Sequence, residues 1–477
     1  MSGVKTKEFR DAVHGYISVP ADWCAAFVDT PIFQRLKHIE QTSMRPLYPC
    51  ARHDRFAHSL GVYHLAKIAL DRLRENTDPI VLDGVDLAKY EIAFLAAALM
   101  HDCAHAPFSH IFERHYNRNN RAEDFLLSLV DDEFRRDYAD LKDQGKATAE
   151  HELFSAAVFL EHYRWAFQQL AREIDPIVVA RMITGCIHSL AEDAERQVVN
   201  CLIQLLNGPA IDVDKLDYVI RDTSSSGVNN ISIDVQRLLS SLEISAGPRK
   251  RLLVFRKSAL SVLQSVLDGR NYLFRWIYSH HTVQYYGLIL QQAVERLDEV
   301  LSEGRPGAFL DAVFSRQVFD SPVRFGSFSL FLPTDYDFLA LLKQHREQIA
   351  EVDELLARKP QRIPLWKTQA EFEQIFRDVG EKQRTAIRGK VPRILEDVIG
   401  PEARQTLVVP VKPKVLQIED REVFVKLLDK PIPYEDVAAA WSERPGKRNV
   451  SFFYVYIPRH RAASVRQCID KLMAAPA

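Results

Sequence analysis

The chain has 477 residues, of which 47% are apolar and 26% are charged, and its formal net charge at pH 7 is −2. This composition is ordinary for a globular protein, and the near-neutral balance argues against a general electrostatic attraction to nucleic acid or to a membrane surface. One hydrophobic core rarely extends over so long a chain, so we expect two or more domains.

The first residues and the cysteines indicate the compartment. Residues 1–10 are polar and do not resemble a secretory signal. The best apolar run, residues 92–100, is too short to cross a bilayer. The six cysteines include no Cys-x-x-Cys pair, which fits reduced thiols better than a disulfide framework or a zinc ribbon. We therefore expect a cytoplasmic protein with no membrane partner.

Helical signals dominate residues 30–300. The phrase Asp-Thr-Pro at 29–31 is typical of a helix start, and residues 60–68 have helical apolar spacing. Residues 90–100 are apolar almost all round, which predicts a buried helix. The charged stretch 118–146 predicts no single element, and we interpret it as partly looped or lid-like. Further helices are expected at 152–174, 196–206, 232–243, 257–267 and 271–302.

The composition changes near residue 305. Glycine and proline interrupt residues 304–333, and residues 369–396 have the pattern of a charged helix. Strands rich in valine and aromatic residues are expected at 406–412, 423–428 and 450–457, before a last helix at 462–473. The predicted fold class is mainly α, with a helical core over residues 1–305. A smaller α+β region over residues 306–477 would serve oligomerisation or regulation.

Three short phrases contain the residue types of a metal site. His58 lies in Arg-Phe-Ala-His-Ser-Leu-Gly-Val, His101 and Asp102 end the apolar helix, and Asp214 lies in Ile-Asp-Val-Asp-Lys-Leu-Asp-Tyr. Imidazole and carboxylate ligands together suit Fe, Mn, Zn, Co or Ni better than Ca. A metal held in this way can acidify water and polarise a phosphoryl oxygen.

The alternative interpretation is a set of ordinary core histidines, since a single histidine on an apolar face is more often packed than ligating. That interpretation weakens for the four residues together. An adjacent His-Asp pair at the end of an apolar helix costs free energy unless something matches its polarity. Nine of the sixteen histidines also lie within the first 115 residues.

Five ordered phrases resemble those of the HD-domain phosphohydrolases. Within that family the chain is similar to the deoxynucleoside triphosphate (dNTP) triphosphohydrolases, which include bacterial dGTPase-like enzymes and the mammalian SAM-and-HD-domain dNTPase. The phrases span residues 29–278, about half of the chain, and the resemblance implies an HD-type helical catalytic domain within residues 1–305. They are Asp29-Thr-Pro-Ile-Phe-Gln-Arg-Leu-Lys, Arg55-Phe-Ala-His-Ser-Leu-Gly-Val, His101-Asp-x-x-His-x-Pro-Phe-Ser-His, Ile211-Asp-Val-Asp-Lys-Leu-Asp-Tyr and Arg270-Asn-x-Leu-x-Arg-x-x-Tyr.

The resemblance implies a metal centre beside the scissile phosphate. One divalent ion (Mn, Fe, Zn, Co, Ni or Mg) would be held by His58, His101, Asp102 and Asp214, and a second Mg could arrive with the nucleotide. The catalytic groups would be His105, His110, Glu113 and His151. His110 and Glu113 are three residues apart and can share a helix face, where the carboxylate favours the protonated imidazole. Which histidine protonates the departing 5′-oxygen is left open.

The substrate contacts follow from the same resemblance. A triphosphate carries close to four negative charges, so several cations are needed around it. An aromatic ring against C2′ leaves little room for a hydroxyl, which would favour deoxyribose. The residues are Arg55, Lys215 and Arg270 for the phosphates, Tyr218 and Tyr278 for the sugar, and Gln41 and Asp222 for the 3′-hydroxyl.

Some relatives bind an activating guanine nucleotide near the N-terminus. Asp29 and Gln34 match that site, but Lys37 replaces an arginine and cannot make its planar, forked contact, which argues against GTP as the activator. A second effector site, built across subunits from Tyr48, Arg256 and Lys257, stays open. The family also implies a homo-oligomer, either a tetramer or a hexamer.

The implied reaction is hydrolysis of a dNTP, in which water attacks the α-phosphorus and the bond to the 5′-oxygen breaks. The products are a deoxynucleoside and inorganic triphosphate. Two alternatives stay open. One is another HD-type phosphodiesterase, acting on cyclic or linear nucleotides or on single-stranded DNA ends. The other is a nucleotide-sensing subunit of a regulatory or defence assembly. Nothing in the sequence indicates binding of single-stranded nucleic acid.

Overall fold

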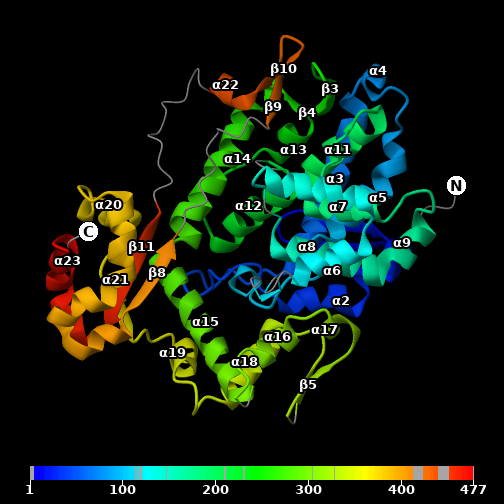
Figure 1. The fold of residues 1–477 in the computed structure, drawn as a ribbon. Helices are drawn as coiled ribbons and strands as arrows, with labels where there is room; N and C mark the ends of the chain where they lie inside the picture. The colour runs from blue at the N-terminus through cyan, green and yellow to red at the C-terminus, as the bar shows by residue number, and fades with distance from the viewer. Residues whose placement is uncertain are drawn as a thin grey trace.

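A mainly helical fold is seen throughout the computed structural model (Figure 1). The structure describes residues 5–112, 115–116, 118, 121–146, 148–208, 211–228, 231–302, 304–326, 328–411, 423–438 and 451–475. Strands in these ranges form only small sheets, of two to four strands each. The predicted fold class, mainly α with a smaller α+β region toward the C-terminus, is confirmed. Within the same ranges, no helix is long and apolar enough to span a membrane.

A bundle of helices forms the centre of the molecule. Helix α3 packs against α5 and α12, and α10 packs against α5, α8 and α11. Residues of α3 and α5 are buried on almost every side, which confirms the buried helix predicted at 90–100. The bundle consists of α3 (Arg55–Asn76), α5 (Leu87–Met100), α8 (Glu150–Val158), α10 (Ile177–Thr184), α11 (Ala194–Leu206) and α12 (Val213–Ser226).

Aspartate side chains cap the two helices that carry most of the candidate site. Asp54 accepts a hydrogen bond of 2.8 Å from the backbone N–H of Ala57 at the start of α3. Asp212 accepts one of 2.6 Å from the N–H of Lys215 at the start of α12. Such caps satisfy first-turn N–H groups and fix the residue at which a helix begins. They therefore set which face of each helix points toward the centre of the bundle.

The charged stretch at 118–146 folds into two helices, α6 (Arg121–Leu129) and α7 (Asp132–Asp143). In α7 the buried side chains Phe134, Tyr138 and Leu141 recur with helical spacing, and Asp137 is buried with them and pairs with Arg181 at 2.9 Å. The stretch is therefore no single element, as expected, but most of its described residues are helical rather than looped. Shorter helices complete this half: α1 (Ala21–Trp23), α2 (Pro31–Gln34), α4 (Pro79–Leu82) and α9 (Arg164–Leu170).

Two hairpins before residue 260 did not follow from the sequence patterns. Strands β1 (Thr6–Asp11) and β2 (Gly15–Pro20) pair antiparallel, as do β3 (Leu242–Ala246) and β4 (Arg251–Arg256). The helix expected at 232–243 is limited to α13 (Val235–Leu239). Residues 242–245 alternate apolar and polar, the period of a strand, and so leave the helix.

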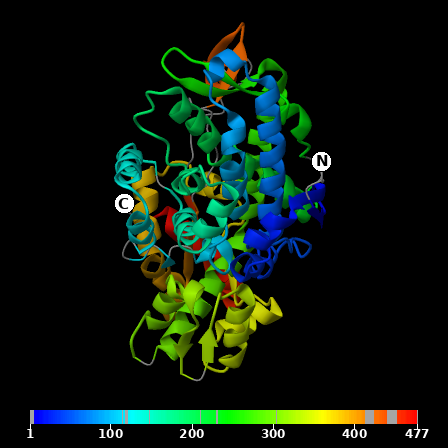
Figure 2. The same cartoon turned by 90° about the vertical axis from the view of Figure 1, so that its right-hand side faces the viewer.

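Helices beyond residue 256 connect the bundle to the rest of the chain. Helix α14 (Leu260–Tyr272) continues into a π-helical turn, Leu273–Tyr278, and α15 (His281–Leu301) follows. Below the bundle in Figures 1 and 2, in yellow-green, lie the next elements. They are α16 (Ala308–Val313), α17 (Gln317–Asp320), β5 (Val323–Phe325), β6 (Phe328–Leu330), α18 (Asp335–Gln344) and α19 (Glu351–Ala357).

The C-terminal sheet has the order β7-β11-β8 and is antiparallel, with Tyr454 opposite Val409. It packs with helices α20 (Gln369–Ile375), α21 (Glu381–Ile399) and α23 (Val465–Met473) on one side of the molecule (Figure 1). The strands are β7 (Arg362–Pro364), β8 (Leu407–Val411) and β11 (Phe452–Pro458). The strands predicted at 406–412 and 450–457 and the final helix are confirmed.

The third predicted strand joins a different sheet. Strand β9 (Phe424–Leu427) runs parallel to β4, and β10 (Lys430–Pro433) pairs with β9, giving the order β10-β9-β4-β3. Helix α22 (Tyr434–Ala438) follows. Phe309 and Leu297, on opposite sides of residue 305, belong to one hydrophobic cluster. The domain boundary at 305/306 therefore stays a prediction.

Candidate active site

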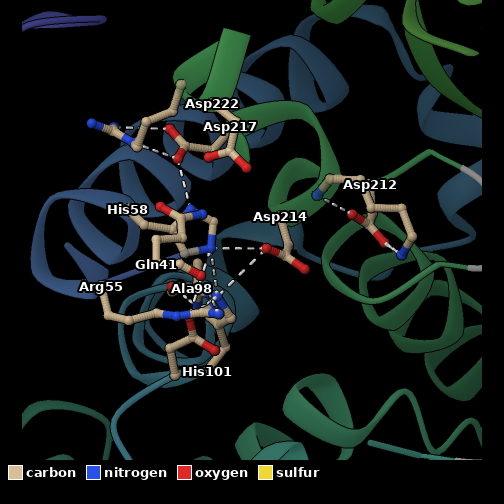
Figure 3. A network of polar contacts seen from close by, with 12 residues as sticks. Gln41, Arg55, His58, Ala98, His101, Asp212, Asp214, Asp217 and Asp222 are labelled. Atoms are coloured by element: carbon tan, nitrogen blue, oxygen red, sulfur yellow. Dashed lines mark hydrogen bonds and ion pairs between the residues drawn. The ribbon is translucent and has the colours of Figure 1, made fainter. Parts of the chain in front are cut away.

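Four side chains from three parts of the bundle converge on one point, and Figure 3 shows three of them, His58, His101 and Asp214. His58 lies on α3, His101 and Asp102 follow α5, and Asp214 lies in the first turn of α12. His58 Nε2 is 3.0 Å from Asp214 Oδ1 and 3.3 Å from His101 Nε2. Asp102 Oδ2 is 3.7 Å from His58 Nε2 and 3.6 Å from His101 Nε2. The structure thus brings together all four predicted metal ligands.

These separations fit a shared cation. Two ligand atoms about 2.1 Å from one ion, and at right angles around it, lie about 3 Å apart. The second nitrogen of each ring is already engaged: His58 Nδ1 is 2.7 Å from Asp217 Oδ2, and His101 Nδ1 is 2.9 Å from the carbonyl oxygen of Ala98. Both Nε2 atoms are therefore directed to the shared point. The residues present fit one divalent metal ion.

Burial and neighbouring charges act in opposite directions on the ionisable groups around this point. Burial alone would lower the pKa of His58, but its hydrogen bonds to Asp214 and Asp217 raise it to about 9. Burial opposes ionisation of Asp102, but Arg55 and the nearby histidines hold its pKa well below its usual range. Arg55 Nη1 donates to Asp102 Oδ2 over 2.7 Å. Asp102 Oδ1 is buried and has no hydrogen-bond partner among the described residues.

Asp217 is a residue of this centre that the sequence analysis did not identify. It is fully buried, and besides His58 it accepts from Arg221 Nε (2.8 Å) and Nη2 (3.0 Å), while His14 Nε2 lies 2.6 Å from its Oδ1. Burial would raise its pKa, but Arg221 and the two histidines hold it well below the ordinary value. Asp11 of the N-terminal hairpin accepts from Arg221 Nη1 over 2.7 Å. The hairpin therefore supports the candidate metal site indirectly, through the contacts of Asp11 with Arg221 and of His14 with Asp217.

Three further histidines form a second cluster beside the first. The ligand nitrogens of His105, His110 and His151 lie within 4.8 Å of one another, and the rings of His105 and His151 stack with centroids 4.4 Å apart. His151 Nε2 is 3.8 Å from Asp102 Oδ1, so Asp102 faces both clusters. Burial, together with Arg55 and the neighbouring histidines, holds the pKa of His105 well below its ordinary value. The remaining predicted catalytic residue, Glu113, lies outside the described residues.

Two pairs of predicted substrate residues are in contact. Arg270 Nε donates to the hydroxyl of Tyr218 over 2.9 Å, and the hydroxyl of Tyr278 donates to Asp222. His53, which the sequence analysis did not identify, places Nε2 2.7 Å from the same Asp222 carboxylate. The helix α12 carries Tyr218 and Asp222 on the face that also presents Asp214, because these positions are four residues apart.

The other predicted substrate residues are held by the protein itself. Lys215 Nζ donates to Asp212 Oδ2 (2.5 Å) and to the carbonyl oxygen of Gly208 (2.8 Å). Burial would lower the pKa of Lys215, but Asp212 and Asp214 raise it above its usual range. Gln41 is buried, and its backbone carbonyl oxygen accepts from Arg55 Nη2 over 3.1 Å. Gln41 therefore lies directly beside the arginine predicted to contact the triphosphate.

The first group of predicted effector residues lies together on the surface. Lys37 Nζ donates to Gln34 Oε1 over 2.7 Å, and Asp29 forms an ion pair with Lys7. Lys37 also lines a cavity of about 530 Å³ with Arg45 and other residues of the neighbouring loop and of α15 and α18.

The second group of effector residues lies on other elements than the first. Arg256 pairs with Glu243 at 2.7 Å, and Lys257 begins the short turn after β4. Tyr48 packs in a small apolar cluster with Leu273. The structure contains one chain, so an effector site built across subunits stays a prediction.

Comparisons with known proteins agree with this geometry. A family model described as HD domain matches residues 55–183. A deoxynucleoside triphosphate triphosphohydrolase SAMHD1 from Gallus gallus is 26% identical over 373 residues, which are 76% of this chain and 55% of that protein. The protein of the same name from Homo sapiens is 24% identical over 483 residues, covering 98% of this chain and 68% of that protein.

Two further relatives have no assigned activity in their names. The uncharacterised protein YwfO of Bacillus subtilis is 26% identical over 299 residues, 62% of this chain and 57% of that protein. A crystal structure of a hypothetical protein from Aquifex aeolicus matches with a TM-score of 0.65 at 19% identity, covering 98% of this chain and 100% of that chain. That match shows a shared fold. The chain spans about half the length of the Gallus gallus and Bacillus subtilis proteins.

The helical bundle and the convergence of His58, His101, Asp102 and Asp214 agree with the HD domain that residues 55–183 match. The proteins to which the chain is similar include two named as dNTP triphosphohydrolases.

Proposed function

We propose that this protein is a metal-dependent phosphohydrolase that cleaves dNTPs into deoxynucleoside and inorganic triphosphate. The observation that carries the proposal is the position of Asp102 between two clusters. Its Oδ2 atom lies within 3.7 Å of His58 and His101, and its Oδ1 atom lies 3.8 Å from His151. The names of the Gallus gallus and Homo sapiens relatives support the choice of substrate.

The candidate metal ligands and Arg55 would have different roles around the phosphate. A divalent cation held by His58, His101, Asp102 and Asp214 would supply positive charge to the α-phosphoryl group and acidity to water. Arg55 is held 2.7 Å from Asp102, which presents its guanidinium at the same place for the charge that develops on the phosphoryl oxygens.

A histidine of the second cluster would act as the general acid that donates a proton to the departing 5′-oxygen. His110 is exposed, whereas His105 and His151 are buried. His110 Nε2 also lies 3.4 Å from Arg55 Nη2, so it stands next to the phosphate-binding arginine. His110 is therefore the member that can exchange a proton with both the leaving oxygen and water. The support of Glu113 for this step stays a prediction.

The tyrosines and Asp222 would bind the sugar. Arg270 is held by Tyr218, and Asp222 is held between Tyr278 and His53, so each polar group is preorganised before substrate arrives. Asp222 can accept a hydrogen bond from a 3′-hydroxyl. Lys215 already pairs with Asp212, and a triphosphate would have to compete for it.

The direct test is product analysis. The purified chain is incubated with each dNTP, and with each pair of dNTPs, in the presence of Mn²⁺ or Mg²⁺, and the products are separated by ion exchange. We expect inorganic triphosphate and deoxynucleoside in equal amounts, with no turnover by Asp214→Asn. Release of pyrophosphate or single phosphate would contradict the reaction. Turnover of cyclic nucleotides or oligonucleotides in place of dNTPs would favour another HD-type phosphodiesterase.

Three further experiments test the remaining predictions on activation, assembly and nucleotide sensing. The dNTP pairs report whether one nucleotide activates hydrolysis of another, which tests an effector site. Size-exclusion chromatography with light scattering, with and without nucleotide, tests assembly into a tetramer or hexamer. Thermal shift with a nucleotide panel detects binding without turnover, which would support a sensing role. The cytoplasmic location also stays a prediction.

A further inference from the structure

The loop that carries the second histidine cluster has an unusual backbone. Phe108 and Ser109 adopt φ values of 57° and 53°, in the left-handed region that residues with side chains rarely occupy. Two such residues in succession persist only where the surrounding structure holds them. They directly precede His110, so what holds them also sets the position of that histidine.

Asp335 is the side chain that holds this turn. It is 3% exposed, and its Oδ1 accepts a hydrogen bond of 2.6 Å from the backbone N–H of Phe108. Its Oδ2 accepts a second bond of 2.9 Å from the N–H of Glu40. One carboxylate in the first turn of α18 therefore joins two loops that are far from it in the sequence.

Arg35 forms a parallel connection between the same regions. It is 4% exposed, and its Nε donates to the carbonyl oxygen of Pro333 over 2.9 Å. Its Nη1 and Nη2 donate to the carbonyl oxygens of Cys103 (3.4 Å) and His105 (2.5 Å). The planar guanidinium thus spans the gap between residues 333–335 and residues 103–105.

The connection continues to the metal centre. The hydroxyl of Ser109 donates to the carbonyl oxygen of Glu40 over 2.5 Å and accepts from Arg55 Nε over 3.0 Å. Arg55 in turn contacts Asp102. A closed set of hydrogen bonds therefore runs from Asp335 through the turn at Phe108 and Ser109 to the metal-ligand cluster.

We propose that residues 333–335 clamp the loop at 103–110, and that Asp335 and Arg35 are positioning residues for His105 and His110. The proposal gives a role to part of the chain beyond residue 305. Its catalytic consequence rests on the proposed function, but its structural consequence does not. Misplacement of a catalytic group by about 1 Å can cost on the order of 100-fold in rate.

The chain offers a matched pair of variants on α18. Asp335→Asn replaces one accepting oxygen with an amide nitrogen and so removes one of the two bonds to the loops. Asp337→Asn makes the same substitution in the same first turn, but Asp337 accepts only from the N–H and hydroxyl of Thr334 among the hydrogen bonds described for it, both at 2.7 Å. A difference in behaviour between the two variants therefore shows the effect of the Asp335 contacts with the two loops.

Hydrogen–deuterium exchange of the Mn²⁺-loaded protein is the first measurement. We expect faster exchange at residues 103–112 in Asp335→Asn and no change there in Asp337→Asn. Bound Mn²⁺ stays at the wild-type ratio in both. In the dNTP assay, Asp335→Asn is expected to lower kcat by about 10- to 100-fold with KM nearly unchanged, while Asp337→Asn keeps the wild-type kcat.

Each outcome decides the proposal. Unchanged exchange at 103–112 in Asp335→Asn would overturn it, and so would an equal effect of Asp337→Asn. Arg35→Lys keeps the charge but loses the forked contact, and it is expected to loosen residues 103–105. Should the variants not fold, the wild-type protein provides the test: rapid exchange of the Phe108 amide would refute the clamp, and protection comparable to helical amides supports it. Absence of dNTP turnover in the wild type would contradict the proposed function alone.

Discussion

Asp217 Oδ2 lies 2.7 Å from His58 Nδ1 and fixes which nitrogen of that imidazole faces the other metal ligands. Asp217 is at least as deeply buried as His58, His101 and Asp102, although it is not one of the candidate ligands. Its remaining contacts come from Arg221 and from His14 of the first hairpin. The candidate metal centre is therefore supported by a residue one helical turn beyond Asp214 on α12 and by a strand pair near the start of the chain.

The first prediction concerns Asp217→Asn. An amide can satisfy only part of the contacts with two histidines and an arginine, so His58 would lose its fixed orientation. We expect the affinity for Mn²⁺ to fall by about 10- to 100-fold, measured by equilibrium dialysis or calorimetry. The matched control is Asp268→Asn on the exposed face of α14, which should bind Mn²⁺ as the wild type does. Equal affinities in all three proteins would contradict the role given to Asp217.

The second prediction concerns Gly61, which follows His58 by one turn on α3. A Cβ atom there would lie 2.0 Å from Asp217 Oδ1 and 2.4 Å from Arg221 Nη2, closer than atoms can approach. Alanine is the better helix former by about 1 kcal/mol, yet Gly61→Ala should lower the free energy of unfolding and weaken Mn²⁺ binding, because the Asp217–Arg221 pair must move.

Gly389→Ala provides the control for this change. Gly389 is also inside a helix, α21, but nothing lies within 4 Å of the position of its Cβ. There the substitution should stabilise the protein by up to about 1 kcal/mol, as measured by urea unfolding. If Gly61→Ala behaves like Gly389→Ala, the close approach of α12 to α3 at this point is not required.

The third prediction concerns the pH dependence of stability. Burial raises the pKa of Asp335 to about 7 despite its two backbone hydrogen bonds. The folded protein therefore keeps a proton between about pH 4 and pH 7 that the unfolded chain releases, so the free energy of unfolding must fall as pH rises through this window. Asp335→Asn removes the titrating carboxyl group and with it this contribution to the pH dependence of the free energy of unfolding. Urea unfolding at pH 5 and pH 8 should show a smaller decrease for the variant, and identical decreases would refute the assignment.

The fourth prediction concerns the sugar pocket. The Tyr278 hydroxyl donates to Asp222, which also contacts His53. Tyr278→Phe removes that donor, so Asp222 loses one of the groups that hold it. We expect KM for dNTPs to rise with a smaller change in kcat, because Asp222 would contact the 3′-hydroxyl rather than the reacting phosphate. A 3′-deoxy substrate analogue should be far less sensitive to the substitution. Equal losses for both substrates would argue against this contact.

The convergence of the four candidate metal ligands could be predicted from sequence because they lie in short phrases whose residue types have few other uses together. His101 and Asp102 end an apolar helix, and His58 and Asp214 lie just after capped helix starts. The buried helix at 90–100 and the aromatic strand at 452–458 followed from local periodicity in the same way.

Other parts of the site depend on contacts between distant segments. Asp217 and Asp335 look like ordinary helix-surface acids in the sequence, and only the packed fold buries them against His58 and Phe108. Strand β9 pairs with β4 about 170 residues earlier in the chain, a choice that no local pattern specifies. A sequence signal that could have drawn attention to this contact is Gly61, a glycine inside a predicted helix, although it does not by itself identify Asp217.

The central claim is that His58, His101, Asp102 and Asp214 hold one divalent cation, and anomalous diffraction from crystals grown with Mn²⁺ tests it most directly. The account predicts a single strong peak in the bundle, about 2.1 Å from the Nε2 atoms of both histidines and within bonding distance of both carboxylates. A peak elsewhere, or none at this point with the four side chains ordered, would contradict it.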